Sequence, residues 1–300
     1  MFKRERIVSF ILFSIVFVVY AISASRTIPF WDSPEFVTSS YNLQATHPPG
    51  SPFYTMLCSV ILQFFPATKA AFISNLISGF FGALTVTFLF KTTYYITTKI
   101  QTNKSAFETT YLPYFTGITS ALTLAFSNSF WVAAIEAEVY TLSFALIIIM
   151  FYVMLKWENA KNRSTETKLI LLFALLLGIA TGVHLITISI IIPLSLLFTH
   201  KKFGLSIKNI VISLIIGCVL FFSIYFFAIQ GLIKISSFID IWLVNTLKLK
   251  VNIGVIITVV VLFIFFLISL WLTHKKNKFV LHNITLAILF FLIGFSSYIM

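Results

Sequence analysis

The chain contains very little charge for its length. Only 10% of its 300 residues are Asp, Glu, Lys or Arg, whereas 59% are hydrophobic and the mean hydropathy is +1.01. A soluble domain has too little interior to hide this much apolar surface, which excludes a soluble protein. Several apolar stretches approach the ~20 residues that cross a bilayer, without the alternation of a lipid-facing barrel strand. We therefore predict an all-α polytopic membrane protein.

Cysteine is also scarce, and its placement excludes two further classes of protein. Cys58 and Cys218 both lie within apolar runs, where cysteine behaves as a small hydrophobic residue, so no disulfide framework is expected. The sequence has no Cys/His spacing of a metal site, no glycine-rich phosphate loop and no Ser-His-Asp order. We predict no metal ligands from the sequence, and the need for a divalent metal stays open.

The apolar runs predict about nine spans in one transmembrane domain over residues 1–300. The first run is longer than the apolar region of a signal peptide, so we expect an uncleaved helix. Residues 53–65 are too few to span the membrane and suit a re-entrant or interfacial helix. Residues 26–70 then form a first periplasmic loop with short helices, and 230–250 a semi-polar surface segment. The predicted spans are 7–25, 71–90, 113–128, 139–156, 169–183, 185–199, 209–229, 253–273 and 279–298.

Basic residues are distributed unevenly between the predicted loops. If 53–65 does not cross, sixteen of the 21 Lys and Arg residues fall on the side of the N-terminus. Cytoplasmic loops carry such an excess, so this side is cytoplasmic. The net charge of +12 is then an orientation signal, and we predict no nucleic-acid partner. The acids on the opposite side are Asp32, Glu35, Glu136, Glu138 and Asp240.

Two of the nine acidic residues lie three positions apart, directly after the first apolar run. Asp32 and Glu35 fit a capping box, and Trp31 with Phe36 fits a hydrophobic staple, so a helix from about Ser33 to Leu43 is predicted. The same carboxylates, held at a membrane surface, are also candidates for a general base. Spacing leaves both interpretations open, and they are compatible.

A rigid loop follows, with His47 before two prolines and a glycine. Three prolines in five residues restrict the backbone and hold the imidazole on a stiff segment. The loop is either a simple turn before residues 53–65 or a place where His47 contacts a phosphate or hydroxyl group.

A second polar turn precedes the run at 139–156. Glu136 and Glu138 do not share a helix face, so they are expected to have different roles. In one interpretation, the negative charge of Glu138 is stabilised by the macrodipole at the start of the helix 139–156. In the other, Glu138 packs towards the first acidic loop and binds a polar group, and Tyr140 supports it there. His184, in the tight turn 181–184 on the same side, is either a turn residue or a ligand. Any phosphate would be bound by scattered cations, among them Arg26, Lys69, Lys234 and Lys248.

Four segments together carry a resemblance to a known family: WDSPEF, THPPGSPFY, SFWVAAIEAEVYTL and TGVHLITI. In this order they resemble the membrane-embedded C-class (GT-C) glycosyltransferases. Within that class they are similar to a bacterial branch of unknown function, related to a vertebrate protein O-mannosyltransferase that acts on plexin and receptor ectodomains. Pro34 departs from the Gly of many relatives, and full-length relatives are longer, so we expect this chain to be an N-terminal part.

The resemblance implies a GT-C-like helical bundle whose first outer loop is catalytic. It implies a polyprenyl-phosphate sugar donor, with mannose or a similar hexose, and a hydroxyl acceptor on an exported protein. Asp32 would be the base, and Glu35 would either orient the acceptor or share the role of base. The substrate-binding residues would be Trp31, His47, Glu138, Tyr140 and His184. The protein would lie in the bacterial inner membrane, with its N-terminus cytoplasmic and the active loop periplasmic.

Two other functions remain to be weighed against a transferase. A transporter or flippase for a lipid-linked sugar places ionisable groups near the membrane midplane and uses broken helices. Here the acids cluster at the predicted outer ends, which disfavours transport. A scaffold whose outer loop docks a partner is the third possibility.

Overall fold

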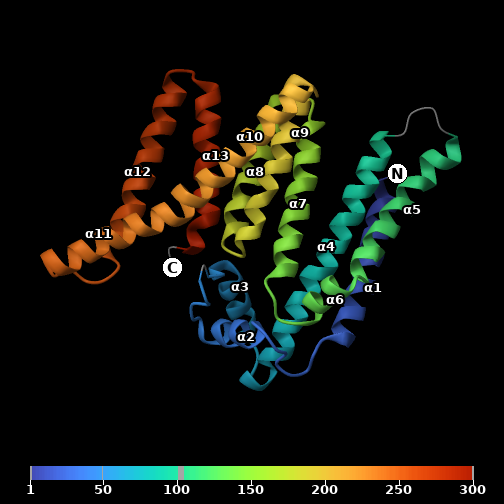
Figure 1. Ribbon diagram of the computed structural model, residues 1–300, viewed down its shortest axis with the longest axis horizontal. Helices are drawn as coiled ribbons and strands as arrows, with labels where there is room; N and C mark the ends of the chain where they lie inside the picture. Colours follow the sequence, from blue (N-terminus) through green and yellow to red (C-terminus); the bar gives the residue numbers. More distant parts are fainter. Residues whose placement is uncertain (1, 49, 101–104, 299–300) are drawn as a thin grey trace. The chain divides into compact units, whose positions relative to one another are not determined.

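Helices account for all regular structure in the part of the chain that the computed structural model describes, residues 2–48, 50–100 and 105–298 (Figure 1). Pro49 of the proline loop and Lys104 of the basic loops lie outside these ranges. The predicted all-α class is confirmed. The helices, with η marking 3-10 and π segments, are α1 (Phe2–Ser23), α2 (Ser33–Asn42), α3 (Pro52–Leu62), η1 (Ala67–Lys69), α4 (Ala70–Ile100), α5 (Ala106–Ala125), α6 (Asn128–Ile135), α7 (Tyr140–Glu158), α8 (Arg163–Thr181), η2 (Leu185–Ile190), α9 (Ile191–Phe203), α10 (Ile207–Ser223), η3 (Ile224–Gly231), α11 (Leu232–Leu247), α12 (Ile253–Lys275), α13 (Phe279–Phe295) and η4 (Ser296–Tyr298).

Eight of the described helices are long and apolar enough to cross a membrane. A ninth span results if α5 and α6, which meet at an angle of 66°, are counted as one broken span. Helix α3 has only 11 residues, too few to cross a bilayer at 1.5 Å per residue. The chain is therefore a polytopic membrane protein, as its composition predicts.

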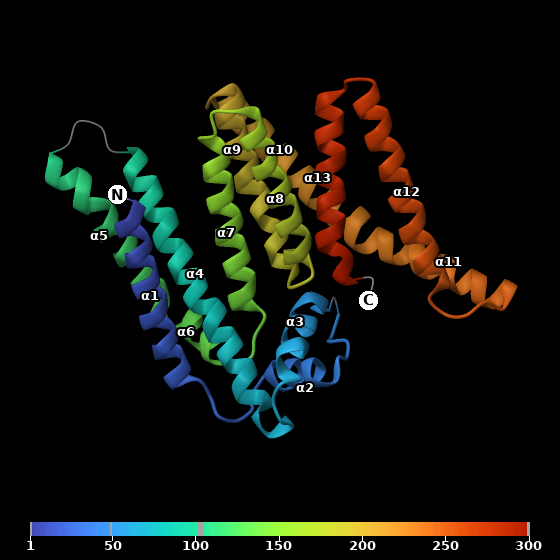
Figure 2. The ribbon, with the colours of Figure 1, turned by 180° about the vertical axis from the view of Figure 1, so that it is seen from behind.

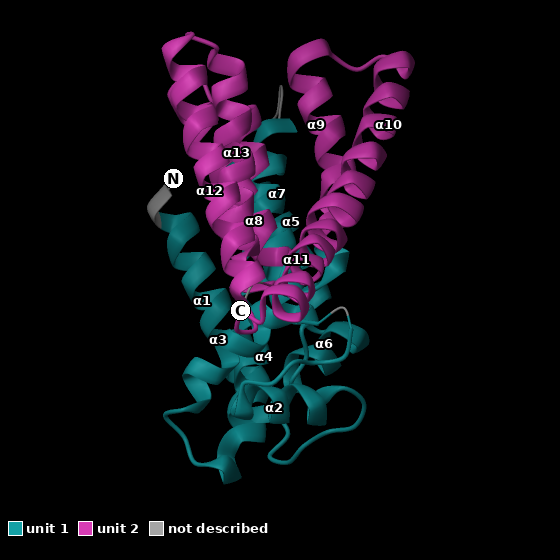
Figure 3. Ribbon diagram, turned by 90° about the vertical axis from the view of Figure 1, so that its left-hand side faces the viewer, with its two compact units in different colours: residues 1–152, 182–187 teal, residues 153–181, 188–300 magenta. Residues whose placement is uncertain are grey.

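The chain divides into two compact units, which are described separately (Figure 3). Unit 1 comprises residues 1–152 and 182–187, and unit 2 comprises residues 153–181 and 188–300. Helix α7 begins in unit 1 and ends in unit 2.

The core of unit 1 is formed by α1, α4, α5 and α6, and α1 runs beside α4 (Figure 2). Two glycines of α4 allow this close approach. A Cβ added at Gly82 would lie 3.0 Å from Ala134 Cβ and 3.1 Å from the ring of Tyr20. The fully buried Tyr20 donates a hydrogen bond to the Ala125 carbonyl (2.8 Å), so its hydroxyl is satisfied within the apolar core.

Unit 2 contains two closely packed helix pairs. In the pair α9 and α10, Ser195 Oγ donates to the Ser213 carbonyl (2.8 Å) and Thr199 Oγ1 donates to Ser213 Oγ (2.9 Å). In the pair α8 and α13, Gly178 and Gly294 face each other, and a Cβ at Gly178 would lie 2.0 Å from the Phe291 carbonyl oxygen. Small residues let membrane helices approach to backbone contact, where dispersion and weak polar contacts stabilise the pair.

The structure has no helix break between the predicted span at 209–229 and the predicted surface segment at 230–250, and the position of the membrane surface along this run stays a prediction. Residues Ile207–Leu247 form one helical run of 41 residues, with the π-helical segment η3 in its middle. At 1.5 Å per residue the run is about 60 Å long, roughly twice the thickness of a hydrocarbon core. Gln230 and Gly231 follow residue 229, but the helical run continues through them as η3 and α11.

We predict that Gly178→Leu separates α8 from α13 and destabilises unit 2. Because the new side chain meets backbone rather than a movable side chain, the cost is about 3 kcal/mol. Thermal unfolding of the detergent-solubilised protein measures the effect. Ser164→Leu, at an exposed position of the same helix, is the control and leaves the midpoint unchanged. Equal midpoints for the two variants would contradict the close crossing.

Candidate functional site

Helix α2 places the two carboxylates of the first loop. It begins at Ser33, as predicted, and Pro34 occupies its first turn, where no backbone N–H is needed. The predicted capping box is wrong: Asp32 is the N-cap residue but accepts no side-chain capping bond. The carboxylate of Asp32 is exposed, and that of Glu35 turns to a different partner.

Glu35 holds His47. One carboxylate oxygen accepts a hydrogen bond from the His47 backbone N–H, and Oε2 lies 2.8 Å from His47 Nδ1. The hydrogen bond to His47 lowers the pKa of Glu35, and the same bond raises the pKa of His47. Both pKa shifts favour the charged pair, and the lowered pKa makes Glu35 a weaker proton acceptor than an isolated glutamate.

The proline loop is closed by local hydrogen bonds. The Gly50 N–H donates to the His47 carbonyl (2.8 Å), and the Ser51 N–H donates to Thr46 Oγ1 (3.0 Å). Gly50 has a φ of 84°, a conformation that residues with a Cβ rarely adopt. This explains the glycine in the motif and fixes the position of His47.

Two serines join the first acidic loop to the second polar turn. Ser33 Oγ, fully buried, donates to the Ala137 carbonyl (3.0 Å). Ser78 Oγ of α4 accepts from the Glu138 N–H (3.1 Å) and lies 3.4 Å from the Glu138 carbonyl. Asp32 directly precedes Ser33, and Glu138 directly follows Ala137. The buried Ser33–Ala137 hydrogen bond therefore joins the segments that carry these two acids, although Asp32 and Glu138 are 106 positions apart in the sequence.

Glu138 is the most buried carboxyl group of the site. Its Oε2 is inaccessible to solvent and has no hydrogen-bond partner among the described residues. Burial raises its pKa to about 7, and the negative charges of Asp32 and Glu136 act in the same direction. At neutral pH the group therefore exchanges a proton readily, which is the property of a general acid or base.

The turn at 182–184 brings a second imidazole to the same unit. The Phe53 N–H at the start of α3 donates to the Gly182 carbonyl (2.8 Å), which ties this turn to α3. The rings of His184 and Tyr140 lie 5.5 Å apart. His184 Nδ1 accepts from the Ile186 N–H (3.2 Å), so the remaining nitrogen, Nε2, carries the proton. Burial lowers the pKa of His184, and the positive charge of His47 lowers it further.

Trp31 does not form the predicted staple with Phe36. Its side chain is 91% exposed, whereas Phe36 is buried and packs against Tyr54 with ring centroids 5.4 Å apart. Trp31 also has a φ of 63°, an uncommon conformation for a bulky residue. The indole is therefore held away from the protein, immediately before Asp32.

Three side chains of the site could provide ligands to a metal ion. Ligand atoms of Asp32, Glu35 and His47 all lie within 4.8 Å of one another. Two carboxylates and an imidazole form a donor set that suits Zn²⁺ or another divalent cation. The sequence alone does not reveal this donor set, because only the folded loop brings His47 close to Asp32 and Glu35. Glu35 and His47 also satisfy each other without a metal.

The cations proposed for phosphate binding are divided between the two units. Arg26 of unit 1 lies over the ring of Phe72, with its guanidinium carbon 4.0 Å from the ring centroid. Lys69 ends η1 in the same unit, whereas Lys234 and Lys248 belong to unit 2.

The site thus gathers most of the residues that the sequence analysis selects. Asp32, Glu35, His47, Glu138, Tyr140 and His184 all belong to unit 1 and are linked by the contacts described above. Ser33 and Ser78, which hold the segments together, were missed. Ser33 lies within the acidic motif, but its hydrogen bond to a residue 104 positions away leaves no local signal.

The fold and the site define a class: a helical, multi-pass membrane protein with carboxylates and imidazoles collected at one end of a helix bundle. Residues 32–207, more than half of the chain, match the family described as the Protein O-mannosyl-transferase TMEM260 N-terminal domain. The chain belongs to this family. The match begins at Asp32 and includes every site residue except Trp31.

One curated relative is the "Protein O-mannosyl-transferase TMEM260" of Mus musculus. It is 28% identical over 215 residues, which cover 71% of this chain and 28% of the mouse protein. The chain thus corresponds to a little more than a quarter of that relative's length. No solved structure matches the chain.

We predict that Glu138→Gln stabilises the protein at pH 8 and has little effect at pH 5. Ionising the buried carboxyl is unfavourable only in the folded state, because its pKa rises from 4.5 to about 7 on folding. Stability is therefore lost as the pH rises through this interval, and the neutral amide avoids the loss. The expected rise in the unfolding midpoint at pH 8 is about 3 °C or more.

Glu35→Gln is the matched control with the opposite sign. The pKa of Glu35 is lower in the folded than in the unfolded protein. The negative charge of Glu35 therefore stabilises the folded protein at pH values above the pKa of the unfolded state. The neutral amide of Glu35→Gln loses this stabilisation. A pH-independent effect of Glu138→Gln would contradict the buried environment of Glu138.

Proposed function

We propose that this chain is the membrane part of a glycosyltransferase that moves a hexose, such as mannose, from a polyprenyl-phosphate donor to a hydroxyl group of an exported protein. The observation that carries the proposal is the convergence of Asp32, Glu35, His47, Glu138 and His184 in unit 1, from three segments distant in sequence. Carboxylates in unlike environments, beside imidazoles, are the groups that proton transfer requires.

Family membership supports the type of reaction. The relatives carry the name protein O-mannosyl-transferase, which describes transfer of mannose to a protein hydroxyl. Positions 32–207 contain the site, so the matched part of the family includes the residues to which we assign the chemistry.

In the proposed reaction Asp32 accepts the proton of the acceptor hydroxyl. The hydroxyl oxygen attacks the anomeric carbon, and the bond between that carbon and the phosphate oxygen breaks. The polyprenyl phosphate leaves with the bonding electrons, and direct displacement inverts the anomeric configuration. Since the phosphate is already a fair leaving group, positioning and charge stabilisation supply most of the rate.

The other residues have supporting roles in this proposal. Glu35 fixes the ring of His47, whose Nε2 is left to donate to the donor phosphate or sugar. His184 offers a neutral Nε2–H donor beside Tyr140. Glu138 places a second titratable group beside Asp32, and the exposed Trp31 offers a flat apolar face to a sugar or a lipid.

We further propose that the site faces the periplasm of a bacterial inner membrane, with the N-terminus in the cytoplasm. The excess of Lys and Arg in the alternate loops supports this orientation. The partners are then the lipid-linked donor, the exported acceptor and the bilayer, and none is a nucleic acid.

We predict that Asp32→Asn lowers sugar transfer by about 100- to 10,000-fold, the range that a general base contributes. The protein still inserts and keeps its unfolding midpoint, because Asp32 is exposed and makes no side-chain capping bond. The assay measures transfer of radiolabelled mannose from mannosyl polyprenyl phosphate to exported proteins in membranes. Glu108→Gln, in the capping box of α5, is the control. Wild-type transfer by both Asp32→Asn and Glu35→Gln would exclude the proposed chemistry.

We predict that Glu35 and His47 act as one unit. Glu35→Gln and His47→Gln each lower transfer by about tenfold, and the double variant is no slower than the worse single variant. A second carboxylate–imidazole pair, Glu158 and His200 in unit 2 at 2.6 Å, provides the control. Substituting that pair with Gln leaves transfer unchanged. Additive losses at Glu35 and His47 would show that they act independently.

A further inference from the structure

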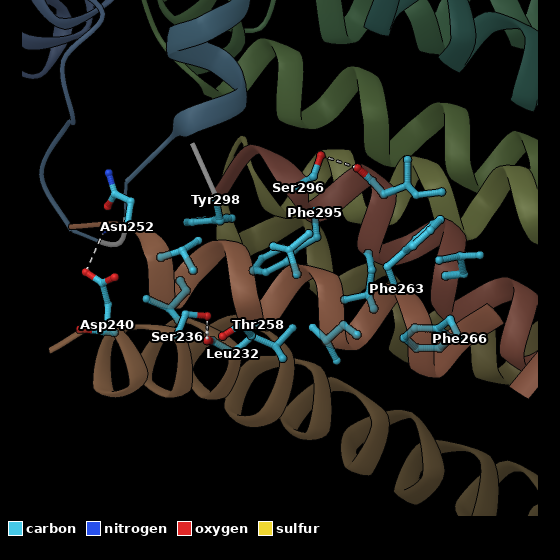
Figure 4. A pocket seen from close by; sticks show the side chains of 18 of the residues that line it. Leu232, Ser236, Asp240, Asn252, Thr258, Phe263, Phe266, Phe295, Ser296 and Tyr298 are labelled. Atoms are coloured by element: carbon cyan, nitrogen blue, oxygen red, sulfur yellow. Dashed lines mark hydrogen bonds between the residues drawn. The ribbon is translucent and has the colours of Figure 1, made fainter. Parts of the chain in front are cut away.

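The pocket between α11, α12 and α13 in unit 2 offers no free charge that would select a ligand (Figure 4). Its only charged lining residue is Asp240, and this carboxylate already accepts from the Asn252 N–H (3.1 Å) and the Gly254 N–H (2.8 Å). The hydroxyl groups of Ser236 and Thr258 donate to backbone carbonyls of their own helices. A surface of unit 1 has more specific chemistry.

The connection between α1 and α2 exposes three large apolar side chains, at the end of unit 1 where α4 begins (Figure 2). The exposed fractions are 49% for Ile28, 86% for Phe30 and 91% for Trp31, and these residues are referred to as the apolar patch. The φ of 63° at Trp31 is unfavourable for a bulky residue, and such strain is retained where the surrounding structure enforces it. Exposed apolar patches mark contacts with a partner or with a membrane.

Hydrogen bonds attach both ends of this connection to α4. At its start, the Asn75 side chain donates to the Ser25 carbonyl (2.9 Å). At its end, Ser33 donates to the segment 137–138, which the Ser78 hydroxyl of α4 also holds. The two attachment points are three residues apart on α4, about 5 Å along the helix axis. The apolar patch therefore begins and ends at the depth of these residues.

The attachment points lie within the apolar part of α4. Residues 70–90 carry no charge, and at the other end Lys91 pairs with Glu5 of α1 (3.9 Å). Counted from Lys91, a hydrocarbon core of ~30 Å covers about 20 helical residues, which reaches past Asn75 almost to the start of α4. Asn75 and Ser78 thus lie at the depth of the outermost part of the core. A large apolar side chain that is exposed at this depth is solvated by lipid.

Charged groups on both sides of the apolar patch place it at the membrane boundary rather than deeper. Asp32 directly follows Trp31, and an ionised carboxylate is costly within the hydrocarbon. Arg26 precedes the patch, with its guanidinium carbon 4.0 Å from the ring centroid of Phe72 in the first turn of α4. Lys69 is exposed directly before the same turn. Cations at this level can pair with lipid phosphates.

The connection from α3 to α4 repeats this pattern. It exposes Phe64 (81%) and Phe65 (38%) and ends at Lys69, next to the first residue of α4. Two connections at one end of unit 1 thus each carry exposed aromatic side chains and a cation. Aromatic rings and cations are enriched together at the level of the lipid head groups.

We propose that Ile28, Phe30 and Trp31 form an anchor that inserts into the lipid interface on the side of the bilayer that carries the site. The partner is the bilayer itself, and the inference goes beyond the proposed reaction. Tryptophan suits this position because its ring is apolar and its N–H can donate to a lipid head group. Since Asp32 directly follows Trp31, the anchor also fixes the height of that carboxylate relative to the head groups.

The test is fluorine NMR of the full chain, labelled with fluorotryptophan, in phosphatidylcholine nanodiscs. Trp31→Phe identifies the Trp31 resonance. We expect a lipid with a nitroxide close to its glycerol to remove most of the Trp31 intensity, and a soluble gadolinium chelate to remove little. Trp157, which is 1% exposed, keeps its intensity with both reagents. Lys161→Trp places an indole in the exposed connection between α7 and α8 and is the control for the chelate.

A second reporter and three contrary results complete the design. Phe30→Trp, made in the Trp31→Phe variant, moves the indole by one position and is expected to respond to the same lipid. Loss of Trp31 intensity to the chelate alone would overturn the proposal and leave the patch to an acceptor polypeptide or a sugar. Loss to neither reagent, or mainly to a nitroxide at the bilayer centre, would overturn it as well. No arm requires sugar transfer, so the outcome is independent of the proposed reaction.

Discussion

The contact that organises the site is the buried hydrogen bond from Ser33 Oγ to the Ala137 carbonyl. A second hydrogen bond, from the Glu138 N–H to Ser78 Oγ, holds the next residue of the same segment. These bonds lie where the first loop meets the connection between α6 and α7, and they bring Asp32 close enough to Glu138 to raise its pKa. An unmade hydrogen bond in such a buried position costs about 1–3 kcal/mol, so separating the two segments destabilises the fold. The chemistry that we propose depends on this junction.

The environments around the carboxylates divide the roles between them. Glu35 is exposed enough to pair with His47, and its lowered pKa makes it a positioning group. Glu138 is buried without a partner for Oε2, and its raised pKa makes it a proton-exchanging group. Asp32 is exposed, directly after the strained Trp31, and in the proposed reaction it is the acid that meets the acceptor hydroxyl. One small cluster thus holds acids of different strength, an arrangement common where protons move.

Composition and local patterns were sufficient for the all-α membrane class and for α2, and they selected most of the polar residues that folding brings together in unit 1. They failed wherever a long-range contact competed with a local one. Glu35 has the spacing of a capping box, but His47 is a better partner because the proline loop delivers both its N–H and its ring nitrogen. The helical run through residue 229 was missed because Gln230, Gly231 and the semi-polar sequence after them resemble a helix end, whereas the chain continues through a π-helical segment. The donor set of Asp32, Glu35 and His47 is likewise assembled only by folding.

The central claim is that the first acidic loop and the second polar turn form one cooperative structure. Hydrogen exchange followed by mass spectrometry tests it directly in the Ser33→Ala variant, with Thr38→Ala on the exposed side of α2 as the control. The account predicts that Ser33→Ala lowers amide protection in residues 24–43 and in residues 136–139 together, while Thr38→Ala leaves residues 136–139 protected. Loss of protection confined to residues 24–43 would contradict it.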